Sequence, residues 1–201
     1  MADAFKYPQT AAAFQRTYHW FYNDLKFVRN TDLESLVMQG IKDAVMLGEQ
    51  KFDQPFGGWT PKSTEFGIAP LRPHVLGKPS SKWSWTSGSS SSVNWSASDT
   101  FVSPHTLDDD ELLLIYGYFN LSATPITLEI QVKPGNVTLP IWNVQPMRMK
   151  DEQYIVFPQP IIVEPRSPIA VDASASSTST AEEAGLLAYL FAPSSVLIAK
   201  K

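Results

Sequence analysis

The sequence lacks cysteine altogether, which excludes disulfide bonds, thiolate metal sites and cysteine nucleophiles. Stability must then come from packing within the chain or from assembly with other chains. Charge is also sparse, because charged residues make up 18 % of the 201 residues, against about 25 % in a typical globular protein. The 16 basic residues are scattered and the net charge is −4. This argues against direct nucleic-acid binding, since clustered Lys and Arg are needed to neutralise phosphates.

Long hydrophobic runs are missing as well. No stretch approaches the ~18 apolar residues of a membrane span. The start MADAFKYPQTAAAF has no basic leader followed by an apolar segment. We therefore expect a soluble protein without a membrane span and without a secretion signal.

Recognisable catalytic and metal-binding motifs are also absent. The sequence has no G-x-S-x-G elbow, glycine-rich phosphate loop or S-x-x-K arrangement in the expected context. His19, His74 and His105 lie far apart, so no zinc site is expected. The acidic run DDDE, from Asp108 to Glu111, prompts a calcium hypothesis. It lacks the alternating spacing and central glycine of an EF-hand loop, which favours a solvated loop before a buried strand.

A glycosidase needs only two carboxylates that the fold brings together. Asp99, Glu129, Glu164 and Asp172 are the candidates for such a pair. On strands, Glu129 and Glu164 are more simply explained as solvent-facing members of an alternating pattern. We expect no enzyme activity, no metal and no cofactor.

Segment 1–50 has a helical pattern that the rest of the chain lacks. Thr31 and Glu34 have the spacing of a capping box, and Gly48 stands where a helix would stop. Upstream, AAAFQRTYHWFYNDLKFV fits either a helix or an extended segment. This section is either the first element of the fold or an arm that docks on a neighbouring subunit. The apolar residues at helical intervals after Thr31 are Leu33, Leu36, Val37, Ile41, Ala44 and Val45.

Segment 51–92 is punctuated by proline and glycine, which interrupt long helices and central strands. We expect it to be rich in loops. It ends in the run SGSSSS, whose flanks SKWSWT and VNWSAS alternate aromatic and polar residues as strands do. A hairpin with a serine-rich tip fits both features, and a flexible linker is the alternative.

Segment 93–201 is predicted to form short antiparallel strands. The run LLLIYGYFNL at 112–121 is typical of a strand that is buried on both sides or central in a sandwich. Apolar and polar residues alternate in ITLEIQV, and KPGN at 133–136 supplies a turn. VTLPIW then resumes the alternation, with Val137, Leu139 and Ile141 on one face.

Further strand candidates follow at short spacing. They are QYIVF near Tyr154, PIIVEP near Ile162, PIAVDAS near Val171 and GLLAYLFA at 185–192. No helix-length connections separate them, which indicates a sandwich or barrel. With SASDTFV near Phe101 and one tryptophan segment, the count reaches the eight strands that a jelly roll needs. We therefore predict a mainly β protein, an antiparallel β-sandwich of jelly-roll type with an N-terminal helical or extended arm.

Tryptophan is the residue type that points most directly to contacts, because an exposed indole stacks on sugars as well as on protein partners. Packing in the core is the alternative role and is expected for at least half of them. The candidate interface or glycan contacts are Trp20, Trp59, Trp83, Trp85 and Trp95.

An N-terminal arm or helix, a proline-rich loop and about eight strands ending in IIVEPRSPIAVDAS and GLLAYLFA resemble single jelly-roll virion proteins. These are capsid and capsid-decorating proteins of phages and other viruses. The resemblance covers roughly residues 93–193 and is one of pattern. It implies oligomerisation, often as trimers, contacts with other capsid proteins, and a location in the virion.

Two classes of function therefore compete. The first is a capsid or capsid-decorating subunit that acts through contacts between subunits. The alternative is a carbohydrate-binding β-sandwich module that uses exposed tryptophans to bind a glycan. A sandwich-fold hydrolase is a more distant rival.

Overall fold

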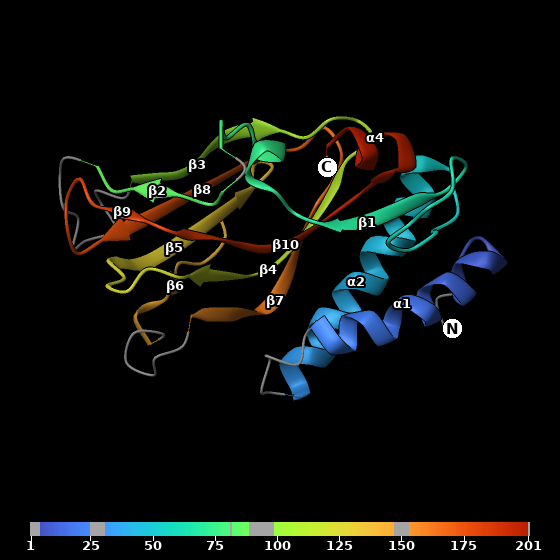
Figure 1. Cartoon of the computed structure of the whole chain (residues 1–201), viewed down its shortest axis with the longest axis horizontal. Helices are drawn as coiled ribbons and strands as arrows, with labels where there is room; N and C mark the ends of the chain where they lie inside the picture. Colours follow the sequence, from blue (N-terminus) through green and yellow to red (C-terminus); the bar gives the residue numbers. More distant parts are fainter. Residues whose placement is uncertain (1–4, 25–30, 81, 89–98, 147–152, 201) are drawn as a thin grey trace.

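The computed structural model describes residues 5–24, 31–80, 82–88, 99–146 and 153–200 (Figure 1). Trp95 and most of the predicted serine-rich hairpin lie outside these residues. In chain order the elements are α1 (Pro8–Asp24), α2 (Thr31–Phe52), β1 (Phe66–Pro70), η2 (Pro73–Leu76), β2 (Trp85–Thr86), β3 (Asp99–Thr106), β4 (Leu112–Asn120), β5 (Thr127–Pro134), β6 (Trp142–Asn143), β7 (Tyr154–Val163), β8 (Pro168–Ala175), β9 (Ala181–Glu182), β10 (Ala184–Pro193) and α4 (Ser194–Ala199).

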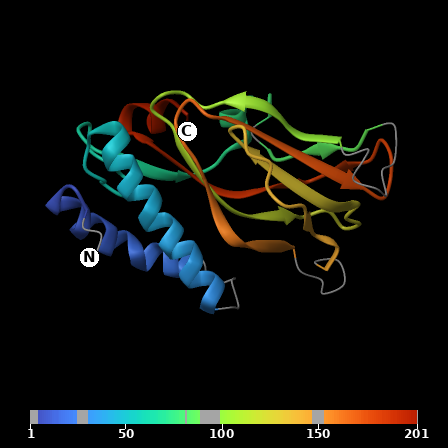
Figure 2. The ribbon, with the colours of Figure 1, turned by 180° about the vertical axis from the view of Figure 1, so that it is seen from behind.

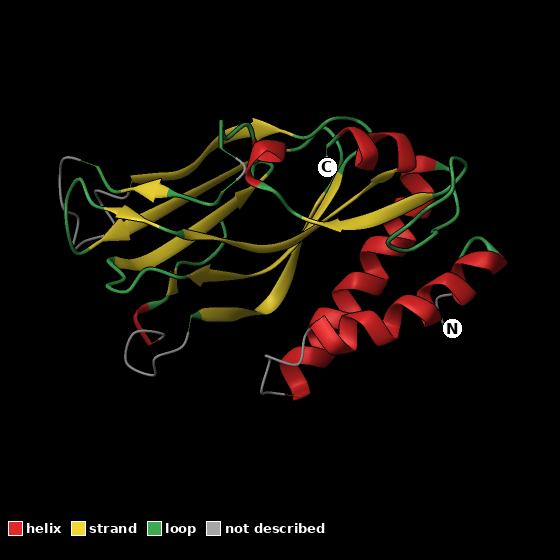
Figure 3. Cartoon of the chain, viewed as in Figure 1, coloured by secondary structure: helices red, strands yellow, loops and turns green. Residues whose placement is uncertain are grey.

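The protein is mainly β, with two four-stranded antiparallel sheets. Their strand orders are β1-β10-β4-β7 and β3-β8-β5-β6, and β2 pairs separately with β9. The pairing is nested along the chain: β1 pairs with β10, β3 with β8, β4 with β7, and β5 with β6. The arrangement is compatible with a β-sandwich, as Figure 3 shows for the strands.

The β1-β10-β4-β7 sheet is buried on both faces. Leu113 and Ile115 of β4 belong to the apolar cluster shared with the β3-β8-β5-β6 sheet. Leu112 and Leu114 point to the opposite face and join a second cluster with the two long helices. Burial on both faces explains why β4 and β10 are apolar almost throughout, as the sequence indicated.

The helices α1 and α2 lie together next to the sheet that contains β1 (Figure 2). The predicted helix after Thr31 is confirmed, but the prediction that it stops at Gly48 is wrong, because α2 continues to Phe52. A Cβ on Gly48 would lie 2.7 Å from the Phe66 ring. This glycine therefore lets the helix approach β1 closely rather than ending it.

The segment upstream of α2 is helical from Pro8 to Asp24, not extended. Ala13, Thr17 and Phe21 recur at helical spacing and are buried against the rest of the chain. Phe21 has its ring centroid 5.6 Å from those of Trp59 and Tyr189. In the single chain, α1 therefore packs as the first element of the fold.

Two strand predictions need correction. The segments at Tyr154 and Ile162 form one strand, β7, with a register shift opposite β4 where Pro158 and Pro160 stand. VTLPIW is not a strand over its length, because only Trp142 falls in β6 and Pro140 has no N–H to donate. Within segment 51–92, the structure contains the short elements β1, η2 and β2 after the end of α2, and loops connect them.

Candidate functional site

An open groove of about 770 Å³ runs between α1 and the segment that leads into β1. We call it the α1 groove. One wall comes from α1, with Ala13, Arg16, Thr17 and Trp20. The other wall comes from residues 57–60, Lys62, Glu65 and Pro70.

Two glycines line the α1 groove, and the backbone there lies close to α1. Gly58 has a φ of 85°, in the left-handed region, and a Cβ there would lie 3.2 Å from Thr17 Oγ1. A Cβ on Gly57 would lie 2.9 Å from Pro61 Cα. A side chain at either position would therefore crowd atoms that line or adjoin the groove, among them Thr17 and Glu65.

The charges of the α1 groove differ from those of the whole chain. Arg16 and Lys62 contribute two cations and Glu65 one carboxylate, although the net charge of the protein is −4. The Glu65 carboxylate accepts a hydrogen bond from the Lys62 backbone N–H at 2.8 Å. Among the described residues, neither the Arg16 nor the Lys62 side chain forms an ion pair. Both cations thus remain available to a ligand.

Two of the five predicted tryptophans meet in this groove. Trp20 is the most exposed of the described tryptophans, with an exposed fraction of 68 %. Trp59 is half-buried, with its ring centroid 5.7 Å from that of Tyr189. Its buried indole N–H has no hydrogen-bond partner within the described part of the chain. Trp20 therefore offers an open ring face, whereas Trp59 is anchored by packing.

The other tryptophans do not belong to this groove. Trp85 is buried, and its indole N–H donates to the Thr100 carbonyl at 3.2 Å. Trp83 is half-buried and covers Gly185, where a Cβ would lie 2.5 Å from its ring. Trp95 lies outside the described residues. A platform that joins Trp59, Trp83 and Trp85 is therefore not what the fold builds.

Arg16, Lys62 and Glu65 could not be recognised as site residues from any sequence motif. Arg16 stands one helical turn before Trp20, so a consistent helical reading of 8–24 would have placed the two side chains on one face. No local pattern links them to Lys62 and Glu65, because a loop brings that wall to the helix.

The four candidate carboxylates are held separately by neighbours. Asp99 accepts from the Gly88 N–H at 2.7 Å, and Glu129 accepts from the Ser174 hydroxyl at 3.3 Å. Glu164 pairs with Lys51 and Asp172 pairs with Lys133. Nothing in these contacts joins two of the carboxylates into a pair.

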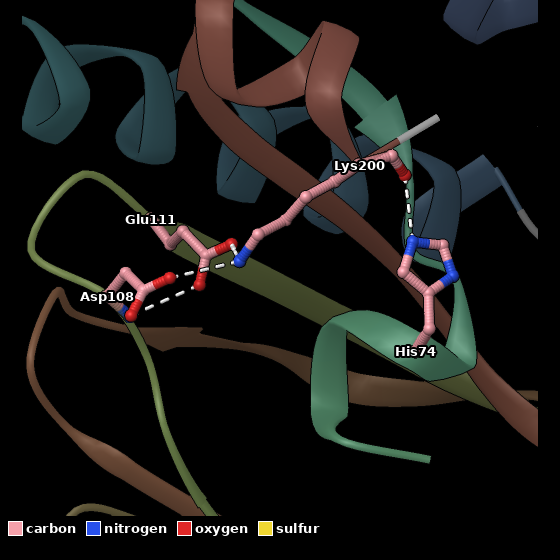
Figure 4. A network of polar contacts seen from close by, with 4 residues as sticks. All are labelled: His74, Asp108, Glu111 and Lys200. Carbon is pink, nitrogen blue, oxygen red and sulfur yellow. Dashed lines mark hydrogen bonds and ion pairs between the residues drawn. The ribbon is translucent and has the colours of Figure 1, made fainter. Parts of the chain in front are cut away.

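The acidic run before β4 binds cations of the chain itself (Figure 4). Lys200 Nζ lies 3.1 Å from Asp108 Oδ2 and also pairs with the fully buried carboxylate of Glu111. Asp109 pairs with Arg166 at 2.9 Å. Within the described residues, no three His, Cys, Asp or Glu side chains come together in a group that could hold a metal ion.

The three histidines are also separate. His74 belongs to η2, and its Nε2 donates to the Lys200 carbonyl at 2.9 Å (Figure 4). His105 lies in β3, where a Cβ on Gly77 would be 3.3 Å from its Nδ1. His19 lies in α1.

A second open groove, of about 480 Å³, lies between β7 and the β5–β6 connection. We call it the β6 groove. Its lining is mostly aliphatic and includes Leu139, Trp142 and Ile161. Val137 also lines it, with an exposed fraction of 58 %, and Ile141, next to the lining residues Pro140 and Trp142 in the sequence, is 40 % exposed. Among the described lining residues, Glu164 is the one charged side chain, and it pairs with Lys51, so the surface is mainly apolar.

None of the helices that the structure describes is both long and apolar enough to span a membrane. No protein-family model, curated protein or solved structure matches the chain. What the protein does must be inferred from its own geometry.

Proposed function

We propose that the protein is a structural subunit of a virion, a jelly-roll capsid or capsid-decorating protein that acts through contacts between subunits. The observation that carries the proposal is the nested pairing of eight strands into two four-stranded sheets. A jelly roll is an eight-stranded double sheet of this kind, built from two Greek keys. Jelly rolls are common in viral capsids and also occur in lectin domains.

The free edges of the sheets favour assembly through side chains rather than through added strands. The outer edge of β1 is already paired, because the Gly57 N–H donates to Phe66 and the Ile68 N–H donates to Gly58. Pro104 interrupts β3, β6 is only two residues long, and the edge strand β7 carries Pro158 and Pro160. A partner subunit would therefore dock on surfaces rather than extend a sheet.

The β6 groove supplies apolar surface of the kind that subunit contacts bury. Val137 and Ile141 expose aliphatic side chains beside it, and exposed apolar surface in one place often marks an interface. The proposed occupant is a second copy of the chain. Stable interfaces bury about 800 Å² on each partner, so the surrounding loops would contribute as well.

Light scattering on the purified chain after size-exclusion chromatography tests the proposal. We expect a stable oligomer, with a trimer as the leading stoichiometry, or specific binding to purified virus shells. A monodisperse monomer that binds no shell would contradict it.

The carbohydrate-binding alternative loses the broad tryptophan platform expected from the sequence. Trp85 is buried and Trp83 is half-buried, so Trp20 is the most exposed stacking surface among the described tryptophans. A glycan site would be confined to the α1 groove.

A further inference from the structure

We propose that the α1 groove binds an acidic carbohydrate, a sugar chain that carries carboxylate groups. This second activity does not depend on the proposed assembly of subunits. It rests on an exposed indole face, one carboxylate and two cations that form no ion pair within the described part of the chain, all in the same groove.

The exposed indole of Trp20 selects for a flat, apolar ligand face. An aromatic face attracts either C–H groups or cations. Arg16 is four residues before Trp20 on the same helix, and Lys62 faces the helix from the other wall. Both would repel a cationic ligand, so the ring is left to pack against the C–H face of a sugar.

The two cations select for negative charge on that ligand. Neither forms an ion pair within the described chain, and a charge-assisted hydrogen bond is stronger than a neutral one. Arg16 is exposed at the rim, where its planar guanidinium can take a carboxylate through two parallel N–H groups. A neutral sugar offers no carboxylate to these two cations, so it could not form such charge-assisted hydrogen bonds.

Glu65 favours an acidic sugar over an anion that has no hydroxyl groups. Its carboxylate lines the groove, and one oxygen already accepts from the Lys62 N–H. The remaining lone pairs need donors, which sugar hydroxyl groups provide. A ligand with both carboxylate and hydroxyl groups therefore satisfies all three charged side chains.

The size of the groove suits a short oligosaccharide. Its volume of about 770 Å³ falls within the ~300–1,000 Å³ that is typical of small-molecule sites. The groove is open to solvent rather than enclosed, so a ligand can enter without movement of the chain.

Calorimetric titration of the full chain with tetragalacturonate tests the proposal, with maltotetraose as the neutral comparison and tetraglutamate as the acidic peptide. We expect tetragalacturonate to bind at least about tenfold more tightly than either. The neutral sugar offers no carboxylate to Arg16 and Lys62, and the peptide offers neither a sugar C–H face to Trp20 nor hydroxyl donors to Glu65. The affinity should fall as salt is raised, because the cations are exposed.

Variants test whether the α1 groove is the site where tetragalacturonate binds. Arg16→Ala and Trp20→Ala should each weaken tetragalacturonate binding about tenfold, whereas Trp20→Phe keeps a stacking face and should retain most of it. Lys82→Ala removes an exposed cation outside the groove and serves as the matched control. Circular dichroism checks that each variant is folded.

Four results would overturn the proposal. Three of them are no binding of tetragalacturonate, equal binding of the neutral sugar, and binding that Arg16→Ala and Trp20→Ala leave unchanged. Equal or tighter binding of tetraglutamate would overturn it in favour of an acidic peptide as the ligand.

Discussion

At the scale of single residues, a buried carboxylate in the middle of the chain pairs with a lysine near the C-terminus. Glu111 is fully buried at the start of β4, and its carboxylate accepts from the Asp108 N–H at 3.1 Å. Lys200, after α4, supplies the opposite charge. Because the two residues are far apart in the sequence, this contact holds the C-terminal helix onto the sandwich.

Replacing Lys200 with Met should therefore lower the free energy of unfolding by about 1–3 kcal/mol, because Glu111 loses a charged partner while it remains buried. Urea denaturation measures the change. Arg166→Met is the matched control, since it breaks an exposed pair with Asp109 and should cost less than about 1 kcal/mol. Equal effects of the two variants would show that burial of Glu111 does not matter.

The same contact predicts how stability depends on alkaline pH. Burial lowers the pKa of the Lys200 ammonium, but hydrogen bonds to Glu111 and Asp108 outweigh this and hold the pKa above its ordinary value of 10.5. A pKa that is raised by folding stabilises the folded state fully below the unfolded value, and this contribution is lost as the pH rises through the folded value. The stability difference between wild type and Lys200→Met should stay constant near neutral pH and shrink above about pH 10.5.

That stability difference is measured by urea denaturation at a series of pH values. A difference that grows above pH 10.5 would contradict the assigned direction of the pKa.

At the scale of elements, α1 is expected to be part of the cooperative fold. Phe21→Ala removes a fully buried ring that contacts Trp59 and Tyr189, and should lower the free energy of unfolding by about 3–5 kcal/mol. Trp20→Ala, next to it and mostly exposed, should change it by less than about 0.5 kcal/mol. Thermal or urea unfolding compares the two. A small effect of Phe21→Ala would instead indicate a detachable arm.

The closeness of α2 to the sheet gives a second prediction. Gly40→Ala should improve helix propensity by about 1 kcal/mol, but its Cβ would lie 2.8 Å from Pro160 Cβ on β7. Overpacking of this kind costs about 1–3 kcal/mol, so we expect a net loss of about 1 kcal/mol in urea denaturation. Gln50→Ala, at an exposed position of the same helix, should have almost no effect. A stabilised Gly40→Ala variant would show that the helix can move away from β7.

The sequence predicted elements well where one physical signal dominated. The capping spacing at Thr31 located the start of α2, and the apolar runs located β4 and β10. It failed where tertiary contacts override a local rule. Gly48 lies inside a helix because Phe66 packs against it, and Pro158 and Pro160 lie inside β7 because that strand is at an edge of the sheet.

At the scale of the whole molecule, the sequence could count strands but could not order them. Alternation reports which face of a strand is buried, whereas the nested pairing brings together strands as distant as β1 and β10. For the same reason, the α1 groove could not be predicted from the sequence. Arg16 and Trp20 share a helix, but Lys62 and Glu65 reach them only through the loop before β1.

Self-association is the property of the whole molecule that the proposed function requires. If the β6 groove is the contact between copies, the double variant Val137→Asp and Ile141→Asp should weaken association at least about tenfold, because a buried unpaired carboxylate is costly. Both side chains are exposed in the single chain, so the fold should be unaffected. Leu121→Asp, at a similarly exposed aliphatic residue outside the groove, is the control. Light scattering over a range of concentrations measures the oligomer, and an unchanged mass for the double variant would place the subunit contact elsewhere on the surface.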